Sequence, residues 1–252
     1  MARDRAQIQR RGSEMSGRFP APLHALAFGA HPDDVEIGAG GLLRKWANQG
    51  KRTGICDLTK AELSSNGTVE RRQQEAAEAS RLLGLHVRLN LELPDRGLAP
   101  VPEQIQAITR IIRLYRPRVV LMPYWEDRHP DHGMCSVLVR EAVFNARIRK
   151  YNAGGEETFP PHKVEHVIAY FINGQTDPQF LVDISKEMEA KMAALGAYRS
   201  QFEMEPGSVA TPLTEGYLER VRAREYIFGQ SAGVVYAEGF VSYTPLLLKD
   251  FL

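Results

Sequence analysis

The chain has 252 residues, of which 43% are hydrophobic, and its formal charge is +1. This length suits one domain with a large buried core, and no apolar run approaches the ~18 residues that a membrane span needs. Its only cysteines, Cys56 and Cys135, lie in apolar sequence, which argues against a disulfide framework and against a thiolate zinc site. The start of the chain lacks the pattern of a signal peptide, so we expect a cytoplasmic protein.

The first 22 residues differ in composition from the rest. Residues 1–22 contain five arginines, two acidic residues and no apolar periodicity, which predicts a basic, disordered arm. We expect no nucleic-acid binding by this arm, because aromatic residues are not interleaved with its arginines. Met15 is an alternative start of translation. Residues 23–252 are expected to form a single domain.

From residue 23 onward, short apolar segments alternate with segments of helical periodicity. This pattern is typical of parallel strands joined by crossover helices. Gly50 and Gly84 stop the first two helices, and Thr68 is a candidate N-cap of the second. The predicted strands are 23–30, 52–58, 87–93 and 119–124, and the predicted helices are 38–48, 69–83, 102–115 and 132–148.

The alternation is less regular after Pro160-Pro161. Strands are predicted at 164–171 and 180–183, helices at 185–201 and 213–228, and a final strand or edge at 236–240. Together these elements predict an α/β fold. We expect a doubly wound, mostly parallel Rossmann-like sheet with helices on both faces and a C-terminal α/β elaboration.

Two runs of histidine and aspartate follow predicted strands. His31-Pro32-Asp33-Asp34 comes after the first strand, and His129-Pro130-Asp131-His132 comes after the fourth. In a sheet of order 3-2-1-4-5 these two strands are neighbours at the point where the strand order reverses. Ligands bind there, outside the carboxyl ends of the strands. The topology therefore predicts that both runs lie in one crevice.

The residues of the two runs suit metal-assisted hydrolysis. His31 and Asp34 lie three positions apart and can bind one ion, and His132 adds a third ligand from across the crevice. The fourth position then stays open for a water molecule, whose pKa zinc lowers to near ~7. Asp33 is the natural base for that water. Fe²⁺, Co²⁺ or Mn²⁺ can replace Zn²⁺ on such ligands.

Hydrolysis of an amide also needs a group that stabilises the oxyanion and a proton for the leaving amine. A protonated His129, kept charged and oriented by Asp131, suits the oxyanion. Either Asp33 or His129 can protonate the amine, and the sequence leaves both open.

Simpler interpretations of these segments exist as well. A single His-Pro-Asp run fits a surface turn, because Pro and Asp form turns, but its repetition at two strand ends favours a site. Gly38-Ala39-Gly40-Gly41 resembles a dinucleotide-binding loop only loosely, since its spacing misses G-x-G-x-x-G. We therefore expect no nicotinamide cofactor.

The two runs resemble the signatures of the LmbE-like (PIG-L) family of zinc-dependent N-acetylglucosamine deacetylases, with Glu36 and Gly38 following the first run. Further segments between about residues 23 and 248 resemble the bacillithiol-biosynthesis branch of this family. These segments are 56–59, 64–68, 94–98, 172–174, 211–217 and 236–240.

The resemblance implies zinc held by His31, Asp34 and His132, with Asp33 as base and His129 paired with Asp131. It also implies N-acetyl-glucosaminyl malate as the substrate. An anionic aglycone needs a cationic partner, and Arg72 occupies the family position for one. Tyr217 aligns with a tyrosine near the family's pocket. Family members form closed homo-oligomers, often hexamers, which is expected here too.

The first functional hypothesis is therefore a zinc-dependent deacetylase of an N-acetylglucosaminide. Its expected partner is a small glycoside with an anionic aglycone, with no nucleic acid and no membrane. One alternative is a broader deacetylase of chitin fragments or an amidase of thiol S-conjugates. A second alternative is a sugar- or metal-binding module, although a binding module has no need of a base beside the water.

Overall fold

The structure is a computed structural model that describes residues 19–155, 159–174 and 177–247. Most of the arm predicted at residues 1–22, including Met15, lies outside the described residues. The extent of the single domain stays a prediction. None of the helices in the described ranges combines the length and the apolarity that crossing a bilayer requires.

The described residues contain one sheet of seven strands, namely β1 Ala25–Gly29, β2 Thr53–Asp57, β3 Val87–Asn90, β4 Val119–Pro123, β5 His166–Tyr170, β6 Phe180–Asp183 and β7 Ala237–Ser242. Their order is β3-β2-β1-β4-β5-β7-β6. Neighbours among β1 to β5 pair in parallel, and β7 is antiparallel to both β5 and β6. The strand order reverses between β1 and β4, as the sequence predicts.

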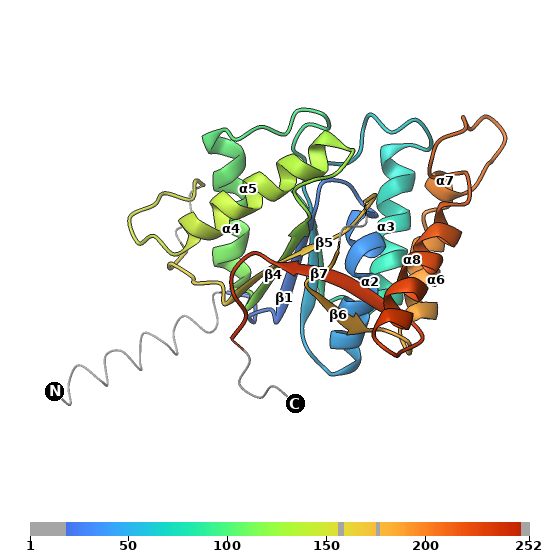
Figure 1. Ribbon diagram of the computed structural model, residues 1–252. Helices are drawn as coiled ribbons and strands as arrows, with labels where there is room; N and C mark the ends of the chain where they lie inside the picture. Colours follow the sequence, from blue (N-terminus) through green and yellow to red (C-terminus); the bar gives the residue numbers. More distant parts are fainter. Residues whose placement is uncertain (1–18, 156–158, 175–176, 248–252) are drawn as a thin grey trace.

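Helices cover both faces of this sheet (Figure 1). Apolar side chains of the two helical layers and the sheet form two buried clusters, one on each face. On one face lie α2 (Asp34–Asn48), α3 (Val69–Leu83), α6 (Met188–Gly196), α7 (Arg199–Phe202) and α8 (Tyr217–Ser231), and on the other lie α4 (Pro102–Tyr115) and α5 (Pro130–Ala146). The predicted α/β architecture is confirmed.

Three predicted elements differ from the structure in ways that matter for the site. Helix α2 begins at Asp34, four residues before the predicted start, because Asp33 caps it directly after the turn. The helix predicted at 185–201 is broken into α6 and α7 near Tyr198, whose buried hydroxyl donates to Glu36 Oε1 at 2.7 Å. The final strand predicted at 236–240 is confirmed as β7, but the alternative of an edge is wrong, because β7 is buried and lies between β5 and β6.

The glycine run at the start of α2 serves close packing. A Cβ on Gly38 would lie 2.2 Å from the ring of Tyr170 and 2.6 Å from the carbonyl oxygen of Phe171. A Cβ on Gly41 would lie 2.7 Å from Ile184. These glycines let α2 approach β5 and the segment after β6 closely, and so fix the N-terminus of α2 at the end of β1.

Candidate metal centre and active site

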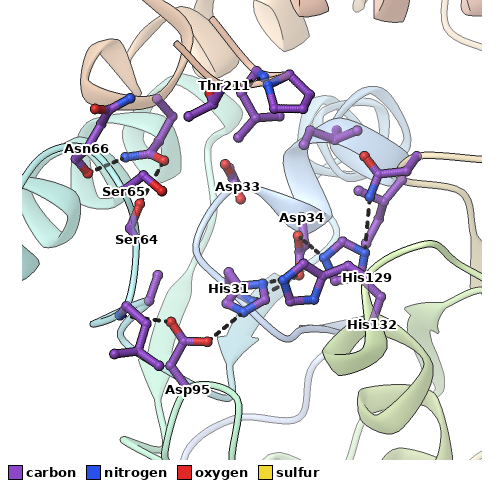
Figure 2. Close-up of a pocket in the computed structure, with 18 of the residues that line it drawn as sticks. His31, Asp33, Asp34, Ser64, Ser65, Asn66, Asp95, His129, His132 and Thr211 are labelled. Carbon is purple, nitrogen blue, oxygen red and sulfur yellow. Dashed lines mark hydrogen bonds and ion pairs between the residues drawn. The ribbon is translucent and has the colours of Figure 1, made fainter. Parts of the chain in front are cut away.

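A pocket of about 330 Å³ lies where β1 and β4 end, and both His/Asp runs reach it. Figure 2 shows His31, Asp34, His129 and His132 gathered on one side, with Asp33 nearer the centre of the pocket. Loops that follow other elements complete the wall, including Ala61, Leu63, Ser64, Ser65, Asn66, Asp95, Arg96, Asn173, Thr211, Pro212 and Leu213.

Both runs lead directly into helices. Asp33 is the N-cap of α2, and His129 is the N-cap of α5. The two helix N-termini therefore meet at the pocket, where their unpaired N–H groups favour negative charge. This placement suits a site that handles carboxylates or an oxyanion.

The predicted ligands His31, Asp34 and His132 lie together. His132 Nε2 is 3.1 Å from Asp34 Oδ1, and His31 Nδ1 is 3.5 Å from Asp34 Oδ2. Ligand bonds of about 2.0–2.1 Å in a tetrahedron put neighbouring ligand atoms about 3.3 Å apart. The donor set therefore fits a divalent ion.

The far nitrogen of each imidazole is bound to carboxylates. Asp127 Oδ1 lies 3.0 Å from His132 Nδ1, and Asp95 Oδ1 lies 3.2 Å from His31 Nε2. Asp131 Oδ2 approaches the same nitrogen of His31 at 3.5 Å. Carboxylates in this position orient metal-binding histidines and increase their basicity. The arrangement is a second sign of a metal centre.

Two other groupings of ligand atoms exist in the described residues, and one of them combines His31 with Asp95 and Asp131, the carboxylates on its far nitrogen. One ring nitrogen from each of His31, His129 and His132 lies within 4.8 Å of the others. His129, however, already accepts a hydrogen bond at Nδ1 from the Asp131 N–H at 3.2 Å. Asp34 contacts the imidazoles of His31 and His132, so these three residues are the better ligand set.

The charges of the metal ligands reflect these contacts. Burial alone lowers the pKa of His132, but Asp34 and Asp127 outweigh it and raise that pKa to about 9. Burial likewise opposes charge on His31, yet Asp131, Asp34 and Asp95 hold its pKa well above 6.5. Without an ion, the neighbouring carboxylates therefore favour the positively charged form of both imidazoles.

Asp33 sits in a strained and buried position. Its φ of 118° is unusual for a residue with a side chain, and its carboxylate pairs with Arg72 at 2.9 Å. Burial raises the pKa of Asp33 to about 7, although Arg72 opposes this shift. A carboxyl that titrates near neutral pH suits a general base.

The predicted pairing of Asp131 with His129 is not what the structure contains. The Asp131 carboxylate instead accepts from the Arg96 N–H at 2.9 Å and pairs with the Arg96 guanidinium at 3.1 Å, besides approaching His31. The backbone N–H of Asp131 donates to His129 Nδ1, which leaves the proton on Nε2. Burial and the nearby imidazoles of His132 and His31 lower the pKa of His129, which favours its neutral form, whereas the sequence analysis expects a protonated one.

The two predicted substrate-binding residues both line the pocket. Arg72 is 5% exposed, donates from Nε to the Pro32 carbonyl at 2.8 Å and binds Asp33, so it holds the first run. Tyr217 is also buried, and its hydroxyl donates to the Ile172 carbonyl oxygen at 3.1 Å. In this structure both side chains stabilise the walls of the pocket.

Three residues of the site were missed by the sequence analysis, and one of them is Asp95, which contacts His31 as described above. Asp127 orients His132, and its carboxylate also accepts from the N–H groups of His129 and Asn173. Asn173 additionally donates from Nδ2 to Asp127 at 2.9 Å. The sequence does indicate Asp127, because this carboxylate follows the end of β4 by four residues and precedes His129 by two.

Comparison with known proteins agrees with this geometry. The family profile for PIG-L, GlcNAc-PI de-N-acetylase, matches residues 26–143. Diacetylchitobiose deacetylase of Thermococcus kodakarensis is 32% identical over 87% of this chain and 82% of its own length. The chain belongs to the PIG-L deacetylase family, a class of hydrolases whose members depend on a metal.

Two further relatives extend the comparison. The probable N-acetyl-alpha-D-glucosaminyl L-malate deacetylase 2 of Bacillus cereus is 29% identical over 71% of this chain and 84% of its own length. The crystal structure of the conserved protein TT1542 from Thermus thermophilus is 43% identical, covers 91% of this chain and 99% of its own, and superposes with a TM-score of 0.82. The sheet flanked by helices is therefore shared with this family, and the chain acts as a deacetylase of N-acetylated, sugar-like substrates.

Proposed function

We propose that the protein uses Zn²⁺ to hydrolyse the N-acetyl group of an N-acetylglucosaminide, releasing acetate and the free amine. The observation that supports this most directly is the pair of imidazoles that share Asp34. Each of them has one nitrogen toward Asp34 and the other nitrogen on a carboxylate. A buried base, Asp33, lies beside them.

In this proposal His31, Asp34 and His132 hold the metal. When bound, the ion lowers the pKa of water and polarises the acetyl carbonyl. Asp33 takes one proton from the attacking water, and Arg72 keeps the Asp33 carboxylate oriented during this transfer. The strained backbone at Asp33 is stabilised by the same contact and by the Arg72 bond to Pro32.

His129 is proposed to stabilise the oxyanion as a neutral donor. Its Nδ1 is occupied by the Asp131 N–H, so Nε2–H remains for the developing negative charge. The N-termini of α2 and α5 add to this stabilisation. Because a neutral His129 is a poor acid, Asp33 returns its proton to the leaving nitrogen as the C–N bond breaks.

The proposed substrate is N-acetyl-glucosaminyl malate. Its support is the resemblance of several loop segments and the 29% identical relative named for that glycoside. Arg128 offers an exposed guanidinium at the pocket, where it donates to Asn173 Oδ1 at 3.0 Å. Diacetylchitobiose is the second candidate, because the 32% identical relative is named for it.

The test measures acetate release by chelator-stripped protein, before and after addition of one equivalent of Zn²⁺. The substrates are N-acetyl-glucosaminyl malate, diacetylchitobiose and free N-acetylglucosamine, and the Asp33→Asn variant is run alongside. We expect activity only with metal, none in the variant, and the highest kcat/KM for the malate glycoside. Activity on none of the three would favour a thiol S-conjugate amidase or a binding module.

A further inference from the structure

One wall of the pocket belongs to a long connection. Residues 203–216, here called the wall loop, join α7 to α8 without helix or strand, and Thr211, Pro212 and Leu213 in it line the pocket. Irregular loops of this length in a compact domain are usually functional. The wall loop therefore decides part of the shape that a substrate meets.

The middle of the wall loop is fastened by one buried side chain. Asn66, which is 7% exposed, donates from Nδ2 to the carbonyl oxygen of Val209 at 2.9 Å. The Val209 N–H donates back to Asn66 Oδ1, also at 2.9 Å. The side chain of Val209 is 53% exposed, so apolar burial contributes little at this point. The Asn66 amide thus makes two hydrogen bonds with the backbone of Val209, as the backbone of a neighbouring strand would.

Asn66 is itself fixed in place. Gln201 donates from Nε2 to the Asn66 carbonyl oxygen at 3.0 Å, and its Oε1 accepts from the Ser64 hydroxyl at 3.0 Å. Ser64 and Asn66 line the pocket as well. The Asn66 side chain therefore ties two walls of the same pocket together.

A second, more exposed contact holds the beginning of the wall loop. Arg71 makes a two-pronged ion pair with Glu205, at 2.6 and 2.8 Å. The two side chains are 37% and 26% exposed. This pair is screened by solvent, so it contributes less than the buried Asn66 contact.

We propose that Asn66 determines the size of substrate that the enzyme accepts, by fastening the wall loop beside the pocket. The inference rests on the proposed deacetylase function. The pocket of about 330 Å³ is at the lower end of ligand pockets, which span roughly 300–1,000 Å³. It suits one N-acetylglucosamine unit with a small aglycone. A second sugar ring requires the wall loop to move, and this movement breaks both bonds between Asn66 and Val209.

The test compares two neutral β-glycosides that differ in the size of the aglycone, namely methyl N-acetyl-β-glucosaminide and diacetylchitobiose. In the zinc-loaded Asn66→Ala variant, the ratio of kcat/KM for the disaccharide to that for the methyl glycoside rises about tenfold, since two hydrogen bonds no longer oppose opening. The matched control is Asn152→Ala, which removes an exposed asparagine whose Oδ1 accepts from Gly154 N at 2.9 Å away from the pocket. That control leaves the ratio unchanged.

Two further measurements keep the inference open to refutation. Glu205→Gln loosens only the exposed contact, so the ratio moves in the same direction by about threefold without a risk to folding. Amide hydrogen exchange at Val209 becomes faster in Asn66→Ala. Equal changes for both substrates in both variants, or unchanged exchange at Val209, overturn the inference. A wild-type enzyme that deacetylates neither of these glycosides nor N-acetyl-glucosaminyl malate contradicts the proposed function instead.

Discussion

Zinc binding at pH 7 is expected to displace protons from both His132 and His31. The pKa of His132 is about 9 and that of His31 is well above 6.5, because both imidazoles lie against carboxylates. Each must lose a proton before the nitrogen facing Asp34 can bind a metal. For His132 alone, the two pH units between 9 and 7 correspond to about 2.7 kcal/mol, or about a hundredfold in apparent affinity.

The sign of the pH dependence follows directly. Both folded-state pKa values are raised, so protons compete with the metal below them and the competition fades as the pH rises. Between pH 7 and pH 8 the apparent affinity is expected to increase about tenfold from displacement of the His132 proton, and the raised pKa of His31 adds to this increase. Isothermal titration calorimetry in two buffers of different ionisation enthalpy counts the protons at each pH.

The control separates the imidazoles from the neighbouring base. The pKa of Asp33 is about 7, so this carboxyl contributes about half a proton of its own at pH 7 when the ion binds. Asp33→Asn removes that contribution and leaves the two imidazole protons. Zinc binding to this variant at pH 7 without proton release would refute the assignment of both histidines as ligands that are held charged by carboxylates.

Three further changes test the site and the fold. Asp127→Asn removes the negative charge beside the His132 imidazole and is expected to weaken zinc binding about 10–100-fold in a chelator competition, whereas Glu126→Gln, on an exposed neighbour, leaves it unchanged. Arg72→Met removes the charge that lowers the pKa of Asp33, so the acidic limb of the kcat/KM profile moves up by about 1–3 pH units, and an unmoved limb contradicts the pairing. Gly38→Ala forces a Cβ to within 2.2 Å of a tyrosine ring of β5 and is expected to lower the free energy of unfolding by ~1–3 kcal/mol. The control is Gly196→Ala in α6, because the added Cβ meets nothing within 4 Å there. Thermal unfolding of both variants measures the loss, and equal melting temperatures would contradict it.

Much of the fold could be predicted from the sequence because local signals and topology agree. The helix predicted at 102–115 and the strand predicted at 180–183 have the bounds that the structure gives them. Thr68 caps α3 by accepting from the Arg71 N–H, and Gly84 ends that helix with a φ of 71°. The position of β7 was harder to predict, since pairing between distant strands depends on contacts that no local pattern encodes.

The candidate site was predictable in position and only partly in its connections. The neighbouring strand ends bring His31 and His132 together, and this follows from strand order alone. Which carboxylate meets which imidazole depends on side-chain directions in the loops. Asp131 follows His129 closely in sequence, yet its carboxylate contacts Arg96 and His31. The carboxylate beside His132 is that of Asp127.

The strand ends position the reacting groups, whereas the loops shape the pocket, so one fold can carry this chemistry with different substrates. Asp33 and His129 occupy the N-cap positions of the helices that follow β1 and β4, so the sheet sets their positions, and close packing at the glycines of α2 also fixes Asp33. The wall loop, in contrast, is held by Asn66, by an exposed ion pair and by the Arg220 guanidinium, which donates to the carbonyl oxygens of Pro212 and Glu215. A change at Asn66 therefore alters the shape of the pocket without moving the reacting groups. Loops that line a rigid site in this way can vary in sequence and length while the catalytic geometry is kept.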